Sequence, residues 1–450
     1  MRHTMTLGLL LAAMTAPAAF AANVDLVTLP SRQSVQLTIY NSEDITLVKE
    51  TRYVTLKKGP NKLQFSWANT LIDPTSVELR PLDHAGQIEV TDTVFPGQKP
   101  QHLIWNIESE FEGQVKVEVT YFTSGLTWQM DYVATCDPGE TAMKFRGYVR
   151  VFNNSGEEYE NAEIRMIVGT INLVEKIADL ARRRGIQPPY GGDDFKTLRG
   201  GVLHRSLELA VQAKADQDAP ETEAKKIVKE GLSEYFLFSV QGTETIPNGW
   251  SKRMQAVQAD GVKFDIVYRL RTYQYGPRPV RFFIWRNDEE HKLGDSPLPD
   301  GLVRVFRDNG KDGLAYLGEK LLRYVPIKAE IEVNLGPDDL VVYESRQTQV
   351  ERFNFVFDTS SHVCGWDERQ QWIHTIRNYR DKPIAFELRL QLGGDVEYTS
   401  EVATTLFDYH TTETKLSVGA RGKREYPCTV LIHHGANAKQ DRILPKDPTR

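Results

Sequence analysis

Most of the chain alternates apolar and polar residues with a period of two, from about residue 35 onward. Val115, Val117, Val119 and Tyr121 alternate with polar residues, and a similar run covers 262–271. Because successive side chains of a strand point to opposite faces, this pattern is typical of sheets with one buried face and one wet face. Strands buried on both faces would be apolar throughout. We therefore predict a mainly β protein of antiparallel β-sandwiches.

One region departs from this pattern, because between 171 and 231 the apolar period is close to 3.6, as in a helix. We predict a helical insert there, with a first helix ending at Gly185, a second over 202–213 and a third over 220–231. Such an insert could serve as a lid or as a partner-binding arm. Its polar composition also fits a solvated tether.

The first residues have the build of a secretory signal. Arg2 is followed by an apolar run over 7–14 and by the small-residue exit Ala19-Phe20-Ala21. The apolar run is much shorter than the ~20 residues that span a bilayer. We therefore predict a signal peptide over 1–21 and an exported protein, periplasmic or secreted.

Charge and cysteine content exclude several classes of protein. The chain has 55 Lys and Arg against 61 Asp and Glu, a net charge of −6 with no block of like charge, which argues against nucleic acid as a partner. Its three cysteines, Cys136, Cys364 and Cys428, form no C-x-x-C pair, so we expect no structural zinc and no cofactor. Three buried thiols, or one disulfide with a leftover thiol, both remain open.

The length of 450 residues suggests about three domains. We predict an N-terminal β-domain over 30–122, a central β-domain with the insert over 123–358, and a C-terminal β-sandwich-like module over 370–435. The polar tail, 436–450, is predicted to be disordered. A weak internal echo links 148–156 with 374–381, where each stretch reads as a strand that ends in Asn and a polar turn, as in a hairpin of an immunoglobulin-like sandwich.

A weak calcium motif lies at 308–319. Asp308, Asp312 and Glu319 occupy the first, fifth and twelfth positions of an EF-hand loop. Gly310, however, leaves the third position without a ligand, and the flanking residues alternate like strands. An Asn-Gly hairpin turn explains the same residues without a metal.

Candidate catalytic residues are scattered, and each has an ordinary structural explanation. His362, Cys364 and Asp367 could form a thiol site, but no family signature surrounds them. The adjacent histidines 433 and 434 would point to opposite faces of a strand. Carboxylates that a glycosidase could use stand at Asp265, Glu289, Glu290 and Asp295.

Aromatic residues near these carboxylates could contact a carbohydrate or a protein partner. Sugar rings stack on exposed aromatic side chains, although aromatic residues in strands more often pack in a core. The candidates are Trp250, Tyr273, Tyr275 and Trp285.

Several motifs together resemble the bacterial mucoidy-inhibitor-A-like family. They are Tyr40-Asn41-Ser42, Ile72-Asp73-Pro74-Thr75-Ser76-Val77, Gly125-Leu126-Thr127-Trp128, Asn153-Asn154-Ser155-Gly156 and Pro297-Leu298-Pro299-Asp300-Gly301. The resemblance implies an exported, β-rich protein with a central domain of unknown function, and it brings no catalytic residues. Longer members of the family have a coiled coil where 83–125 holds no heptads.

These observations favour a non-catalytic binding or scaffold protein of the cell envelope, with an envelope protein or a polysaccharide as its partner. The alternative is an envelope hydrolase that acts on glycan or peptide through carboxylates of the central domain. A concave pocket that unites two acids, or a Cys/His pair, would distinguish the hydrolase from the binding protein.

Overall fold

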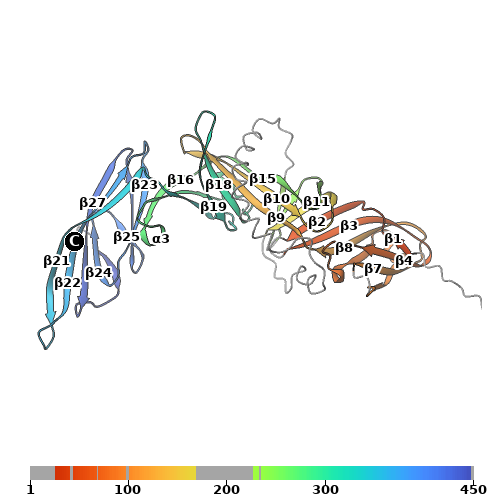
Figure 1. The fold of residues 1–450 in the computed structure, drawn as a ribbon, viewed down its shortest axis with the longest axis horizontal. Helices are drawn as coiled ribbons and strands as arrows, with labels where there is room; N and C mark the ends of the chain where they lie inside the picture. Colours follow the sequence, from red (N-terminus) through yellow and green to blue (C-terminus); the bar gives the residue numbers. More distant parts are fainter. Residues whose placement is uncertain are drawn as a thin grey trace, which may run out of the picture. The chain divides into compact units, whose positions relative to one another are not determined.

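A computed structural model describes residues 26–40, 44–67, 69–97, 101–168, 227–232 and 235–446 of the chain. Within these ranges strands dominate, and the helices are single turns such as α3 (Thr272–Tyr275) (Figure 1). The prediction of a mainly β protein is therefore confirmed. No helix in the described ranges is long and apolar enough to cross a membrane.

The described chain divides into two compact units. The N-terminal unit holds the described residues up to Gln36 together with Leu47–Thr123, and the C-terminal unit holds Leu37–Thr46 and the described residues from Ser124 onward. The division after Thr123 lies one residue beyond the predicted boundary, but Leu37–Thr46, which the prediction placed in the N-terminal domain, belong to the C-terminal unit. Up to Thr123 the elements are β1 (Leu26–Thr28), β2 (Ser34–Tyr40), β3 (Ile45–Leu56), β4 (Gly59–Ser66), η1 (Pro74–Ser76), β5 (Glu78–Pro81), η2 (Ala85–Gln87), β6 (Ile88–Val94), β7 (His102–Ser109) and β8 (Gly113–Thr123).

Beyond Thr123 the described residues form the remaining strands and two one-turn helices. They are β9 (Leu126–Cys136), β10 (Ala142–Asn153), β11 (Tyr159–Val168), β12 (Ile227–Leu232), β13 (Tyr235–Val240), β14 (Glu244–Ile246), β15 (Trp250–Lys263), β16 (Asp265–Arg271), α3, β17 (Val280–Arg286), η3 (Glu289–His291), β18 (Gly301–Asp308), β19 (Leu314–Leu322), β20 (Glu330–Pro337), β21 (Val341–Phe357), β22 (Val363–Asn378), β23 (Ile384–Gln391), β24 (Asp395–Ser400), β25 (Thr404–Asp408), β26 (Thr411–Val418), β27 (Lys423–Gly435) and β28 (Arg442–Lys446).

The N-terminal unit contains a four-stranded sheet in the order β1-β4-β7-β6, and its strands β3, β8 and β5 are neighbours in a second sheet. Val115, Val119 and Tyr121 of β8 are buried, as their alternation predicts. Phe65 of β4 lies with its ring centroid 5.9 Å from that of Trp105 and 5.7 Å from that of Tyr121. Aromatic packing between the strands therefore builds this core.

The C-terminal unit begins with a five-stranded sheet in the order β15-β10-β9-β18-β19 and with the strands β12-β13-β11, to which β14 adds. The predicted strand over 262–271 is interrupted at Phe264: β15 ends at Lys263 in this sheet, and β16 starts at Asp265 in another. The alternation continues across Phe264 because the apolar residues of β15 and those of β16 each face a core. The pattern therefore predicts burial correctly but not the change of sheet.

The predicted helical insert lies almost entirely outside the described residues. Its last residues, 227–231, belong to β12, which pairs antiparallel with β13 from Ile227 opposite Val240 to Leu232 opposite Tyr235. The prediction of a helix up to Gly231 is wrong for this stretch. Lys229 and Glu230 suit a helix as well as an edge strand, so pairing with the apolar strand β13 decides the conformation.

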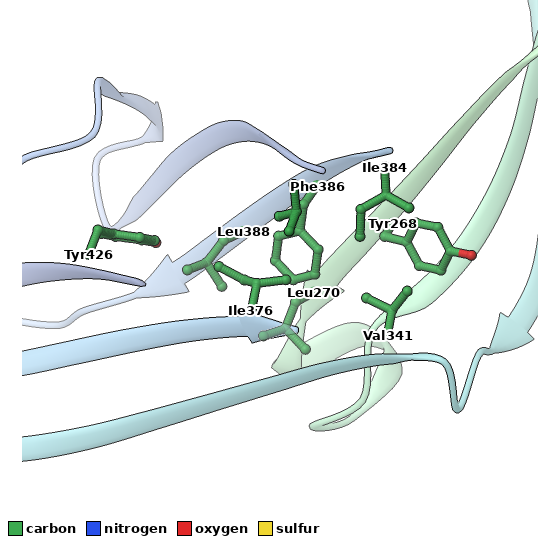
Figure 2. Packing of buried hydrophobic residues seen from close by; sticks show 9 residues of the cluster. Tyr268, Leu270, Val341, Ile376, Ile384, Phe386, Leu388 and Tyr426 are labelled. Atoms are coloured by element: carbon green, nitrogen blue, oxygen red, sulfur yellow. The ribbon is translucent and has the colours of Figure 1, made fainter. Parts of the chain in front are cut away.

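The last two sheets form a sandwich. One has the order β20-β17-β16-β23-β26-β25 and the other β21-β22-β27-β24-β28. Their shared core includes Leu270 of β16, Ile376 of β22 and Phe386 of β23, whose side chains lie close together in Figure 2. The predicted boundaries at 358 and 370 are therefore misplaced, because strands from residue 265 onward supply this core.

The prediction of a disordered tail over 436–450 is also wrong as far as Lys446. β28 pairs in parallel with β24, and Ile443 is 1% exposed beside Val396, Tyr398 and Val430. A single buried isoleucine and one strand pairing hold this segment against the sheet, a signal too short for periodicity to reveal. Residues 447–450 lie outside the described residues.

The sheets are mixed rather than purely antiparallel. The pairs β1–β4, β9–β18, β16–β23 and β24–β28 are parallel. Parallel neighbours need long crossover connections, and here whole strands of another sheet supply them. Apolar and polar residues alternate in the same way in parallel and in antiparallel strands that have one face in water, so this pattern does not predict strand direction.

The internal echo in the sequence corresponds to two similar corners, although neither is a hairpin. β10 and β11 lie in different sheets, as do β22 and β23. The buried residues Asn153 and Asn378 end β10 and β22. In each, the side-chain amide donates to the carbonyl oxygen four residues on, 2.7 Å away, and accepts the N–H two residues on. The repeated asparagine thus turns the chain from one sheet into another.

Replacing Asn153 with alanine is expected to destabilise the C-terminal unit by about 2 kcal/mol or more, because the Glu157 and Ile246 carbonyl oxygens lose a buried donor. Urea unfolding followed by intrinsic fluorescence would measure the change. Asn154→Ala, one residue further on and half-buried, is the matched control, with an expected change within ~0.5 kcal/mol. Equal effects of the two substitutions would contradict the role of the Asn153 amide.

Candidate functional site

The four aromatic residues predicted to contact a ligand lie in different environments. Trp285 is 1% exposed and packs edge-on against Phe145, so it is a core residue and the prediction of a surface contact there is wrong. Trp250 at the start of β15 is 68% exposed, and Tyr273 in α3 is 49% exposed. Tyr275 is half-buried, with its ring 5.6 Å from Phe282. Tyr273 is the only one of the four that lines one of the hollows described below.

Tyr273 borders a hollow of about 320 Å³ at the end of β16. Its wall is formed by Thr272, Tyr273, Arg389, Leu390 and Gln391. The strands β16 and β23 run in parallel with Arg271 beside Arg389, so the turn α3 and the end of β23 meet at one edge. The hollow therefore combines one exposed aromatic ring with guanidinium, amide and hydroxyl groups.

Arg389 is held in place from two sides. Its Nε lies 2.8 Å from Glu413 Oε1 on the neighbouring strand β26, and its Nη2 lies 2.7 Å from the same oxygen. Its guanidinium carbon stands 3.4 Å from the ring centroid of Phe407 in β25, whose side chain is 52% exposed. Charge pairing and cation–π stacking therefore fix the guanidinium before any ligand arrives.

The same face of the sheet carries a ladder of ion pairs. Arg269 bridges Glu332 of β20 at 2.7 Å and Glu387 of β23 at 2.8 Å. The hydrogen bond from Arg269 lowers the pKa of Glu332. Burial raises the pKa of Glu413, but hydrogen bonds from Arg389 and Lys415 and their positive charges hold it below its ordinary value. Glu332 and Glu413 are therefore ionised at neutral pH, and ion pairs cross-link the strands of this face.

The calcium candidates do not form a ligand set. Asp308 accepts the Gly310 N–H at 2.8 Å in the β18–β19 hairpin, while Glu319 lies opposite Arg304, within the strands and away from the turn. Glu319 Oε2 pairs with Arg304 Nε at 3.3 Å. Among the described residues no cluster of three acidic, His or Cys side chains fits a metal ion. The weak calcium prediction for Asp308, Asp312 and Glu319 is wrong because strands replace the helices that an EF-hand requires.

The candidate thiol site of His362, Cys364 and Asp367 is not assembled within the described residues. His362 is exposed and lies 3.7 Å from Asp358, and Cys364 is exposed on β22. Cys136, Cys364 and Cys428 are all free thiols, two of them buried. Burial raises the pKa of the Cys136 thiol to about 11, so it is protonated and unreactive at neutral pH.

A buried thiol–imidazole pair escaped the sequence analysis. His374 Nε2 lies 3.1 Å from Cys428 Sγ, and His374 Nδ1 lies 2.7 Å from the Tyr343 hydroxyl. Burial raises the pKa of Cys428 to about 11 and lowers that of His374 to about 4, so both groups are neutral near pH 7. A neutral, enclosed pair of this kind is a core network rather than an activated nucleophile.

The adjacent histidines point to opposite faces of β27, as predicted. His433 Nδ1 lies 2.7 Å from Asp367 Oδ1, whereas His434 stacks on Trp366 with ring centroids 4.8 Å apart. Burial acts to raise the pKa of Asp367, but hydrogen bonds from Asn354, from Asn437 and from His433 lower it overall. The pair orients an imidazole, and within the part of the chain that the structure describes no hydroxyl or thiol donates a hydrogen bond to Asp367 or His433.

The four candidate carboxylates of a glycosidase lie in different places of the described structure. Asp265 starts β16, whereas Glu289 and Glu290 are exposed in η3. Asp295 lines a small hollow whose wall contains no second acid. Hydrolysis of a glycosidic bond needs two carboxyl groups across that bond, and this hollow does not offer such a pair.

No protein-family model matches the chain, and no curated protein matches its sequence.

Proposed function

We propose that the protein is a non-catalytic binding protein that contacts a polysaccharide of the cell envelope through the hollow beside α3. The observation that carries the proposal is that the half-exposed Tyr273 lines one hollow together with Arg389 and Gln391. An aromatic face stacks on the apolar side of a sugar ring, while guanidinium and amide groups bond its hydroxyl groups. A few placed polar groups beside an apolar surface are typical of a ligand site.

The rigidity of the surrounding face supports binding rather than turnover. Arg389 is already held by Glu413 and Phe407, so little side-chain entropy would be lost when a ligand contacts it. No carboxylate, histidine or cysteine lines the hollow. These features suit recognition of a sugar more than cleavage of one.

Export to the envelope is part of the same proposal. Its support is the signal-like composition of 1–21 and the resemblance of several motifs to the mucoidy-inhibitor-A-like family. The hydrolase alternative has no comparable support, because the candidate acids and the exposed thiol do not meet in the described structure.

Tyr273→Ala is expected to weaken polysaccharide binding about tenfold, since it removes the stacking surface and leaves the sheet intact. Affinity electrophoresis in gels containing dextran, a neutral polysaccharide, or polygalacturonate, an acidic one, would measure the dissociation constants. Tyr53→Ala, a change at a comparably exposed tyrosine of the N-terminal unit, is the matched control and should leave the constants unchanged.

Retardation by either polysaccharide that Tyr273→Ala reduces would support the proposal, and the gel that causes it would indicate the charge of the sugar. Unretarded wild-type protein in both gels would overturn it in favour of a protein partner. Release of reducing ends from either polysaccharide would instead favour the hydrolase.

A further inference from the structure

A second hollow lies beside the loop 287–298, and a buried asparagine organises it. Asn287 is fully buried, and its Nδ2 donates to Ser296 O at 3.0 Å while its Oδ1 accepts the Gly294 N–H at 3.0 Å. A Cβ atom on Gly294 would approach Asp288 Cα to 2.8 Å, so glycine is required at this position. The loop is therefore tightly fixed around its own side chain.

Two hydrogen-bond donors at this hollow lack a partner among the described residues. Ser296 is 2% exposed, and its Oγ makes no hydrogen bond. Lys229 of β12 is half-buried; its ammonium group lies 5.8 Å from the Phe238 ring centroid, and no hydrogen bond of its Nζ is formed within the described chain. Both residues line the same space, of about 50 Å³. Ser296 Oγ is thus a buried polar group without a partner in the described structure, which calls for an explanation, and the half-buried Lys229 ammonium lies in the wall of the same hollow.

The charges around the hollow favour an anion. Lys229 and Lys292 contribute two ammonium groups and Asp295 one carboxylate, which leaves a single net positive charge in the wall. Burial lowers the pKa of Lys229, although the charge of Asp295 partly opposes this. An ammonium group that is desolvated without a hydrogen-bonded anion is costly, and a bound anion would offset that cost.

We propose that this hollow binds one compact oxyanion, either a carboxylate or a phosphate-like group, through Lys229 Nζ and Ser296 Oγ. Its volume of about 50 Å³ accommodates a few water molecules, at ~10–15 Å³ for each by the same measure, and excludes a sugar ring. None of its lining residues borders the hollow at α3. The oxyanion site is thus independent of the proposed polysaccharide contact.

The test uses the full chain with sodium phosphate or sodium acetate as probes, at constant ionic strength set with sodium chloride. Titration calorimetry and the thermal midpoint are measured for the wild type, Lys229→Met and Ser296→Ala. Lys58→Met, at an exposed lysine of the N-terminal unit, is the control. Both site variants remove an unpaired polar group, so without an anion they should be at least as stable as the wild type.

The wild type and Lys58→Met should show one saturable site for at least one probe, and the midpoint should rise with the logarithm of its concentration above the dissociation constant. Lys229→Met should raise that constant at least about tenfold, because it removes a charge-assisted bond. Preference for acetate would identify a carboxylate ligand and preference for phosphate a phosphoryl ligand. No saturable binding in the wild type, or equal binding by all four proteins, would overturn the proposal.

Discussion

Glu50→Gln is expected to destabilise the N-terminal unit by about 3–5 kcal/mol, the cost of removing one partner from a buried ion pair. Glu50 is fully buried in β3, where its carboxylate lies 2.8 Å from Arg32 Nε and 2.6 Å from Arg52 Nη2 and accepts the Tyr121 hydroxyl at 2.6 Å. Glutamine keeps the shape but removes the charge that neutralises two guanidinium groups. Both guanidinium groups would lose the buried carboxylate that they share.

Hydrogen exchange of the full chain measures this loss locally. Amide protection in β3 and β8 should fall about 100-fold or more, because each 1.4 kcal/mol is a factor of ten. Glu89→Gln, at an exposed glutamate of β6, is the matched control and should change protection little.

A triple variant shows whether the loss of stability comes from the missing ion-pair attraction or from buried charges left without a counter-charge. Converting Glu50, Arg32 and Arg52 together to methionine removes every charge of the cluster, and the stability of the unit should recover most of the loss seen with Glu50→Gln. If the triple variant were much less stable than Glu50→Gln, the ion pairs themselves would be the source of stability.

Alternation predicts the buried residues of this protein well because burial of one strand face is a local property. Val119, Trp128 and Tyr132 are all buried as expected. Sheet membership depends on distant partners, so the change of sheet at Phe264 and the parallel strand β28 left no local signal. The asparagine corners could be predicted in part. The repeated Asn is visible in the sequence, but one of the carbonyl oxygens that Asn153 binds, Ile246 O, is far away in the sequence.

The surroundings of the candidate binding residues likewise depend on partners that are distant in the sequence. Tyr273 was recognisable because aromatic residues in a loop-like stretch are conspicuous, whereas Trp285 looked equivalent in sequence and is buried. Arg389 sits between two leucines of an ordinary strand, and only the pairing of β23 with β26 and of β26 with β25 gives it Glu413 and Phe407. Lys229 belongs to a stretch predicted as a helix, so its approach to Ser296 was beyond sequence reasoning.

Acid should destabilise the C-terminal sandwich through His374. The imidazole is 3% exposed, and among the described residues its hydrogen-bond and ring partners are Tyr343, Cys428 and Tyr426, none of which is charged near neutral pH. Burial therefore lowers its pKa to about 4, against about 6.5 in an unfolded chain. Between these values the unfolded state binds a proton that the folded state does not, so stability falls as pH falls. The full loss, reached near pH 4, is about 3 kcal/mol.

His374→Gln isolates this contribution because glutamine does not titrate. Protonation of carboxylates whose pKa is lowered in the folded state, such as Asp338 and Asp395, also destabilises the fold in acid. These groups are present in both the wild type and His374→Gln, so their effect cancels in the difference. The unfolding free energy of the wild type minus that of His374→Gln should therefore be constant above pH 7 and decline by ~3 kcal/mol toward pH 4. The same difference taken with His362→Gln, whose side chain is 80% exposed, should stay nearly flat. A flat difference for His374→Gln would mean that the imidazole accepts a proton without unfolding the sandwich, and the Tyr343–His374–Cys428 network would then be open to solvent rather than part of a sealed core.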